Sequence, residues 1–121
     1  MLLVKTKLGL SNIHGIGLFA DEFIPKGTII FKEDKYTRII TAEEYQSLSP
    51  LHRDFIDTYA YYNNGVYKCS LDNDRFMNHS DTPNTVDYED ITKADRDIQK
   101  GEEITCNYNN ICDNGKGIDF T

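Results

Sequence analysis

The chain has 121 residues, a mass of 13.9 kDa and 39% hydrophobic residues, which suits one domain with a single core and excludes a disordered or membrane-embedded chain. Twenty acidic residues against thirteen basic ones give a net charge of −7, and no Lys/Arg cluster occurs, which disfavours direct nucleic-acid binding. An acidic domain attracts cationic partners instead, such as a basic peptide, although solubility alone also explains this balance.

The first third of the chain predicts strands. Apolar-rich or alternating runs cover residues 2–8, 16–22, 28–33 and 36–40. Turn-forming residues separate these runs. Between the second and third runs, Pro25 fixes its own φ and Gly27 can take a positive φ, which predicts a turn. We therefore expect hairpins joined by glycine-containing turns.

Residues 41–62 predict one or two helices inserted between strands. Thr41 with Glu44 forms a capping-box pattern, and Ser49 before Pro50 marks a second helix start. Apolar side chains then recur at helical spacing, at Leu51, Phe55, Ile56 and Tyr59.

The remainder returns to short strands and loops. Asn63-Asn64-Gly65 breaks the helical region, and strands are expected at 66–71, 85–88, 92–95 and 103–108, with a turn at Lys100-Gly101. Residues 109–121 form a short tail rich in Asn and Gly. The fold class is therefore mainly β with a short helical insertion, in a single domain over residues 1–121, and not a series of βαβ units.

Targeting signals and cysteine spacing bear on the compartment. No apolar run reaches the roughly 20 residues that span a bilayer, and the first ten residues do not resemble a signal peptide. Cys69, Cys106 and Cys112 are an odd number without a CxxC spacing. We expect reduced thiols and a cytoplasmic protein, or a nuclear one in a eukaryotic host, that is not secreted and does not enter a membrane.

Three segments carry groups that suit a polar ligand. Residues 15–20 hold two glycines one residue apart, which alone indicate a hairpin turn. Residues 75–84 place Asn78 and His79 in a run that also suits a structural loop. Residues 101–108 end in Tyr108, which is either a packed edge-strand tyrosine or a hydroxyl beside a reaction centre.

In this order, the segments HGIGLFA, RFMNHSDTPN and GEEITCNY resemble the SET-domain family of protein-lysine methyltransferases, over roughly residues 3–110. The resemblance is to a minimal, single-domain member of viral or bacterial type. It implies a mainly β fold of several small sheets around a helical insertion. It also implies a C-terminal pseudoknot, in which the last segment threads under a loop.

The resemblance implies S-adenosylmethionine as the cofactor. It assigns cofactor binding to Gly15, Ile16, Gly17, Arg75, Asn78, His79 and Tyr108. Tyr108 is also the expected catalytic residue, with a positioning and electrostatic role, because a hydroxyl with a pKa near 10 is a poor general base.

The resemblance also implies a narrow channel for the substrate lysine, lined by Tyr59, Tyr61, Cys106 and Phe120. Keeping a lysine neutral at pH 7 costs about 4–5 kcal/mol. An apolar, aromatic channel beside a cationic sulfonium lowers that cost. We expect the tail to close this channel through Ile118 and Phe120.

The sequence departs from the family in three places. Asp81 stands where many members have a zinc-ligating cysteine, so we expect no metal site. Cys106 is smaller than the usual aromatic residue, which predicts room for di- or trimethylation. Asn107 replaces an aspartate, which leaves open an alternative: a weak or inactive SET-fold module that binds lysine-bearing peptides.

The expected partner is a lysine-containing protein or peptide, such as a histone or another basic protein. The sequence leaves open whether exposed strands pair to form a homodimer.

Overall fold

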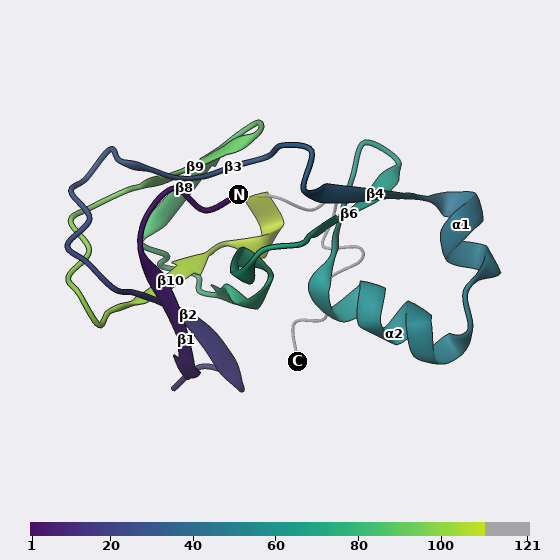
Figure 1. The fold of residues 1–121 in the computed structure, drawn as a ribbon, viewed down its shortest axis with the longest axis horizontal. Coiled ribbons are helices and arrows are strands. Elements are labelled where there is room, and N and C mark those ends of the chain that lie inside the picture. Colours follow the sequence, from purple (N-terminus) through teal and green to yellow (C-terminus); the bar gives the residue numbers. More distant parts are fainter. Residues whose placement is uncertain (111–121) are drawn as a thin grey trace.

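The computed structural model describes residues 1–110, which form ten short strands in three small sheets, with two α-helices and two 3₁₀ turns. Figure 1 shows the helices together at one end of the molecule, joined to the rest through β4 and β6. The mainly β fold class predicted from the sequence is confirmed. The predicted tail residues from 111 onward, Ile118 and Phe120 among them, lie outside the described residues.

The first sheet has the order β1-β2-β10-β7. Its strands are β1 (Thr6–Leu10), β2 (Ile16–Ala20), β10 (Glu103–Cys106) and β7 (Asn78–His79). β1 and β2 form the predicted antiparallel hairpin, and β10 runs antiparallel to β2 and parallel to β7. β10 thus lies between the first and second motifs. The pseudoknot stays a prediction.

The second sheet consists of β3 (Ile29–Lys32), β9 (Ile91–Ala94) and β8 (Thr85–Tyr88). Here the prediction of successive hairpins is wrong, because β3 pairs with β9 and not with β2. The predicted turn does form, since the Thr28 amide donates to the Pro25 carbonyl at 3.1 Å. Ile24, Ile30 and Ile98 are almost fully buried. Burial of these side chains in one core therefore decides the pairing, and the short turn does not.

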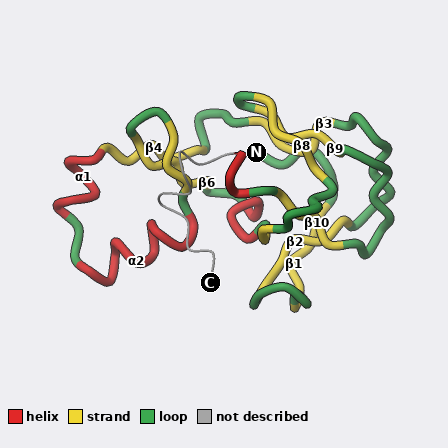
Figure 2. The backbone as a smooth tube through the Cα atoms, turned by 180° about the vertical axis from the view of Figure 1, so that it is seen from behind, coloured by secondary structure: helices red, strands yellow, loops and turns green. Residues whose placement is uncertain are grey.

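The third sheet carries the insertion. It consists of β4 (Thr37–Thr41), β6 (Val66–Ser70) and β5 (Tyr61–Asn63). The helices α1 (Ala42–Ser47) and α2 (Pro50–Tyr59) lie between β4 and β5 along the chain. Figure 2 shows both helices beside β4 and β6. Both predicted helix starts are confirmed: Thr41 Oγ1 accepts from the Glu44 amide at 3.1 Å, and Ser49 Oγ accepts from the His52 amide at 3.3 Å. The Glu44 side chain pairs with Arg38 instead of completing a capping box.

The predicted helical range 41–62 extends too far, because α2 ends at Tyr59 and the next residues form β5. β5 and β6 join through Asn64 and Gly65, whose φ angles are 53° and 80°. Two consecutive positive φ angles are typical of the two-residue turn that matches strand twist. The residues that were predicted to break the helix therefore build a hairpin.

Two 3₁₀ turns and two short strands, β5 and β7 (Asn78–His79), were not predicted. η1 (Asn73–Phe76) is capped by Asp72, whose side chain accepts from the Asn73 amide, and β7 follows after one residue, Met77. η2 (Tyr108–Asn110) follows β10 after one residue. Both turns carry residues of the sequence motifs.

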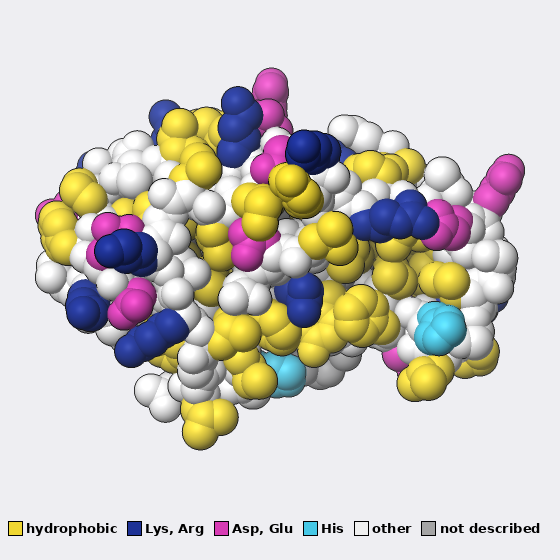
Figure 3. Space-filling view, in the orientation of Figure 1, with side chains coloured by type: hydrophobic (Ala, Val, Ile, Leu, Met, Phe, Trp, Pro, Cys, Tyr) yellow, Lys and Arg dark blue, Asp and Glu magenta, His cyan; other side chains and the backbone are white. Residues whose placement is uncertain are grey.

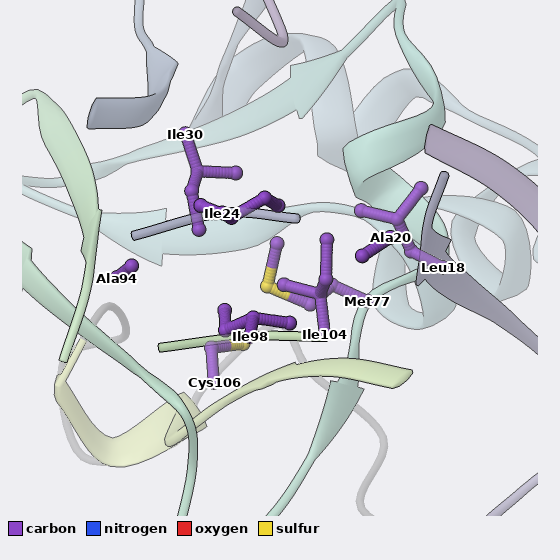
Figure 4. Close-up of a cluster of buried hydrophobic side chains, with 9 residues drawn as sticks. All are labelled: Leu18, Ala20, Ile24, Ile30, Met77, Ala94, Ile98, Ile104 and Cys106. Carbon is purple, nitrogen blue, oxygen red and sulfur yellow. The ribbon is translucent and has the colours of Figure 1, made fainter. Parts of the chain in front are cut away.

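The main core lies between the first two sheets (Figure 4). It is built from Leu18, Ala20, Ile24, Ile30, Met77, Ala94, Ile98, Ile104 and Cys106, with Tyr108 packed against it. A second cluster of Ile40, Ile56, Ala60 and Cys69 joins the helices to the third sheet. Met77 and Cys106 bring the second and third motifs into the same core.

The surface carries charges of both signs. On the face in Figure 3, Lys and Arg side chains lie among Asp and Glu, and hydrophobic side chains gather over the middle. On α2, Ile56 is buried, whereas Leu51 and Phe55 of the predicted apolar face are 74% and 49% exposed. Within residues 1–110, neither α-helix has the length and apolar character needed to cross a bilayer.

Candidate active site

The first motif forms the turn between β1 and β2. The Ser11 amide donates to the Gly15 carbonyl at 2.8 Å, and Gly15 has a φ of 46°, in the left-handed region that favours glycine. A side chain at Gly15 would meet open space, and Ile16 is half exposed. The hairpin-turn interpretation holds, and the same turn presents backbone carbonyls to the second motif.

Asn78 fastens this turn to the rest of the site. Its side chain is buried, and its Nδ2 group donates to the His14 carbonyl and to Glu103 Oε2, both at 3.0 Å, with the Ile16 carbonyl at 3.4 Å. The amide oxygen Oδ1 makes no hydrogen bond within residues 1–110. The amide nitrogen therefore has a structural role, and the oxygen is left to accept from a ligand.

Glu103 is the centre of a small polar network that the sequence analysis did not single out. Ser11 Oγ lies 2.8 and 2.9 Å from the two oxygens of the Glu103 carboxylate, and Asn78 donates to one of them. The carboxylate packs against Gly17, where a Cβ atom would overlap Oε2 and lie 2.9 Å from Cδ. Gly17 is thus required by close packing against the protein itself.

Substituting Gly17 by alanine is expected to destabilise the fold by about 1–3 kcal/mol, because the added methyl displaces a carboxylate held by Ser11 and Asn78. Chemical denaturation measures the effect. In a Glu103→Ala background the same substitution should cost clearly less, since the overlapping atoms are gone. An equal cost in both backgrounds would contradict this packing account.

His79 and Tyr108 are brought together by the parallel pairing of β7 with β10. The Tyr108 amide donates to His79 Nδ1 at 3.0 Å, so the ring proton lies on Nε2, which is 2.8 Å from Asp81 Oδ1. The two rings are tilted, with centroids 5.2 Å apart. The Ser80 amide donates to Cys106, so in an alternating ladder the His79 backbone faces the outer edge of the sheet.

Tyr108 closes the site through its hydroxyl, which donates to the Met77 carbonyl at 2.7 Å. Met77 directly precedes Asn78 and is buried in the main core. Tyr108 is thus held at both ends, its backbone amide by His79 and its side-chain hydroxyl by Met77. A rigid hydroxyl beside the Asn78 motif suits a positioning role.

Tyr108 also lines a pocket of about 600 Å³. Five predicted site residues line it: Tyr59, Tyr61, Arg75, Cys106 and Tyr108. The other predicted cofactor residues, Gly15, Ile16, Gly17, Asn78 and His79, do not. The predicted residues therefore fall into two groups, one that lines the pocket and one around Asn78 and His79. Tyr108 connects them, because it lines the pocket and donates to His79.

The lining of this pocket is more acidic than the apolar, aromatic channel that the family resemblance implies. Five carboxylates line it, at Glu33, Asp74, Asp87, Glu89 and Asp90, beside two cationic side chains, Lys68 and Arg75. Lys68 pairs with Glu33, with Nζ 3.1 Å from Oε1. These acidic residues come from the residue after β3, from η1 and from the β8–β9 hairpin, so sequence spacing gave no signal that they line one pocket.

Two of the carboxylates are held inside the pocket wall. Burial raises the pKa of Asp74 to about 6, although Ser70 donates a hydrogen bond to its Oδ1. Burial also raises the pKa of Asp87, whose Oδ1 accepts from Thr92 Oγ1 at 2.7 Å. Each carboxylate thus has one hydroxyl partner, which only partly offsets the loss of water.

Replacing Asp74 by asparagine is expected to stabilise the protein by on the order of 2 kcal/mol at pH 8. The folded state binds the Asp74 proton more tightly than the unfolded chain, so the wild-type free energy of unfolding falls as pH rises from about 4 to about 6. At pH 4 and below the advantage of the variant should vanish. Urea denaturation at both pH values measures this.

The control for this comparison is Asp90→Asn, which removes one negative charge from an exposed position of the same pocket. Stabilisation of equal size from that variant would attribute the effect to net charge and contradict the burial argument.

Arg75 and Tyr59 line the pocket, and both contact the Phe76 ring. The Arg75 guanidinium lies 4.9 Å from the centroid of the Phe76 ring, and its buried Nε has no hydrogen-bond partner within residues 1–110. Tyr59 packs edge-on against Phe76, with centroids 5.5 Å apart. The predicted channel residue Phe120 lies outside the described residues.

Comparison with known proteins identifies the fold. The sequence profile of the SET domain family matches residues 15–109. A crystal structure of a Plasmodium falciparum protein described as a "putative histone methyltransferase" is similar, with a TM-score of 0.62 and 29% sequence identity over 86% of this chain and 96% of that one. No curated protein sequence matches. The fold is that of a SET domain, with small sheets and short helices.

Proposed function

Because the chain belongs to the SET domain family, we propose that it is a protein-lysine N-methyltransferase, which moves the methyl group of S-adenosylmethionine to the ε-amine of a lysine in a protein substrate. The observation that carries this proposal is the position of Tyr108. Its hydroxyl is fixed to the Met77 carbonyl, beside the Asn78 motif on one side and the pocket on the other. One residue thus links a cofactor site to a substrate site.

The residues around Asn78 fit the proposed cofactor. Asn78 Oδ1 is an available acceptor, which suits the amino group of a methionine moiety, and space lies above Gly15. The His79 backbone faces the sheet edge, where it suits hydrogen bonding to an adenine. Gly15, Ile16, Gly17, Asn78, His79 and Tyr108 are the residues that would hold the cofactor, whereas Arg75, which the resemblance also assigns to it, lines the pocket.

In the proposed reaction the chain supplies position and surroundings. S-adenosylmethionine, when bound, supplies a methyl group that is already activated by its sulfonium charge. Tyr108 orients the incoming amine through a hydroxyl that the Met77 carbonyl holds in place. The amine attacks in its neutral form, and its proton leaves to solvent through the open pocket. No covalent intermediate with the protein is needed.

Asn107 bears on the alternative of an inactive binding module. Its Oδ1 accepts from the Asn109 amide at 3.0 Å and so caps η2, which carries Tyr108. An aspartate at this position would use the same acceptor oxygen. Asn107 therefore still caps the turn that carries Tyr108, although it replaces the aspartate of the family. This favours the active enzyme over the inactive module.

The proposed substrate is a lysine-bearing basic protein. The acidic pocket lining and the net charge of −7 both favour a cationic segment. A histone fits this description, and so do other basic proteins.

The test of the proposed function has two steps. Calorimetric titration with S-adenosylmethionine should give binding that Asn78→Ala weakens. Incubation with labelled cofactor and mixed core histones, or another basic protein mixture, should then label a protein at lysine, and Tyr108→Phe should abolish most of the label. Cofactor binding without transfer to any basic protein would favour the binding module.

The degree of methylation is expected to depend on Cys106, which lines the pocket and is buried in the main core. With its small side chain we expect di- or trimethyllysine, and Cys106→Phe should restrict the product to monomethyllysine. Mass spectrometry of the modified lysine reads this out. The larger phenylalanine ring overpacks a core site and should lower the free energy of unfolding by about 1–3 kcal/mol. The comparison is therefore made below the melting temperature of the variant. Monomethyllysine from the wild type, unchanged in the variant, would contradict the prediction.

A further inference from the structure

Asp74 stands on the same wall of the pocket as the catalytic tyrosine. The Met77 amide donates to the Asp74 carbonyl at 3.0 Å, and the Met77 carbonyl accepts from the Tyr108 hydroxyl at 2.7 Å. Asp74 and Tyr108 are therefore tied to one residue from opposite sides, and both side chains line the pocket.

One oxygen of the Asp74 carboxylate is occupied and the other is not. Ser70 Oγ donates to Oδ1. Oδ2 makes no hydrogen bond and is not among the fully buried atoms, so it is open to the pocket. Within residues 1–110, no Lys, Arg or His pairs with this carboxylate. A partly buried carboxylate without a cation is costly unless a ligand supplies one.

Asp87 repeats this arrangement from the second sheet. Thr92 holds its Oδ1, its Oδ2 carries no hydrogen bond, and it forms no ion pair within the described part of the chain. Lys68, which lines the same pocket, is already paired with Glu33 at 3.1 Å. The pocket thus offers two carboxylates from different elements to an incoming cation.

We propose that Asp74, assisted by Asp87, is the capture site for the target lysine, which it receives as an ammonium ion through Oδ2 before the amine reaches Tyr108. This inference rests on the proposed function. It assigns Asp74 a binding role and not that of a general base, because a carboxylic acid with a pKa of about 6 is too weak a base for a lysine ammonium.

The capture site should have a pH signature. A lysine ammonium stays charged up to about pH 10, whereas Asp74 ionises near pH 6, so affinity should rise about tenfold between pH 5 and 7 and then level off. The other charged groups around Asp74 are Asp72 and the N-terminal ammonium. Across the pocket lie Glu33 with Lys68, Arg75, Asp87, Glu89 and Asp90.

The experiment measures binding of Nα-acetyl-lysine-N-methylamide by NMR titration between pH 5 and 9, without cofactor, and uses the norleucine analogue as an uncharged control. At pH 8, Asp74→Asn should raise the dissociation constant about tenfold and remove the pH dependence. Asp90→Asn, which removes an exposed carboxylate of the same pocket, should have a much smaller effect. Equal losses from the two variants, or equal binding of the norleucine analogue, would overturn the proposal.

A measurement on the unmodified protein guards against misfolding of the variant. The carboxyl ¹³C signal of Asp74 should titrate at a lower pH when the lysine amide is present, because the ammonium stabilises the carboxylate. An unchanged midpoint would refute capture at Asp74.

Failure of the proposed function can be distinguished from failure of the proposed capture site. If the wild type transfers methyl groups but Asp74→Asn leaves KM and its pH profile unchanged, the capture site is wrong and the methyltransferase stands. If the lysine amide binds through Asp74 but no transfer occurs, the capture site stands and the enzyme assignment fails.

Discussion

Tyr108→Phe is expected to lower methyl transfer by about 100-fold or more, while the protein stays folded. The substitution removes only the hydroxyl, which donates to the Met77 carbonyl at 2.7 Å. Loss of one preorganised polar group in an active site typically costs 10²–10³ in rate. Loss of the hydrogen bond should lower the free energy of unfolding by only about 1 kcal/mol. Transfer of labelled methyl and thermal denaturation give the two readouts.

Tyr62→Phe is the matched control for this variant. Tyr62 belongs to β5 and packs against Tyr67 in the third sheet, and it does not line the pocket. Its hydroxyl should be dispensable for transfer. Full activity of Tyr108→Phe would remove the observation on which the proposed function rests.

Asn78→Ala is expected to weaken cofactor binding by about 10- to 100-fold and to destabilise the fold by about 2–3 kcal/mol. The Asn78 amide joins two backbone carbonyls of the first motif to the Glu103 carboxylate, so its loss leaves these acceptors without their donor. Asn73→Ala, at an exposed asparagine one turn earlier, should change neither quantity. Calorimetry and urea denaturation measure both effects.

A charge swap tests the structural role of Asn78 apart from its proposed contact with the cofactor. Asn78→Asp alone should be more damaging than Asn78→Ala, because it places a second carboxylate about as close to Glu103 as the present 3.0 Å contact. Adding Glu103→Gln should recover stability, since an amide at 103 can donate to a carboxylate at 78. A double variant no more stable than Asn78→Asp would show that the Asn78–Glu103 contact does not hold the turn.

Features set by short stretches of sequence could be predicted. The helix starts at Thr41 and Ser49 depend on one side chain and an amide three residues later, and both form as expected. The hairpin of β1 and β2 likewise follows from a local turn. The motif residues Asn78, His79 and Tyr108 were found for another reason: their order resembles a family, and β7 and β10 do bring them together.

Features set by contacts between distant segments could not be predicted. β7 has two residues and exists because β10 lies beside it. Asp74 and Asp87 meet in one pocket although they belong to different elements, and each alone has the sequence signature of an ordinary surface aspartate. Asn64-Gly65 did carry a hairpin signal, which the interpretation as a helix breaker overlooked.

The position of β10 has a consequence for how the proposed cofactor site forms. β10 is the last strand within residues 1–110, yet it lies inside the first sheet, with β2 on one side and β7 on the other. During folding, the N-terminal hairpin can form early, but Glu103 reaches Gly17, and Tyr108 reaches Met77, only when β10 enters. Competence to bind the cofactor should therefore arise late and in a single step, together with the completed sheet. A bound cofactor should in turn slow the release of that strand and the unfolding of the protein.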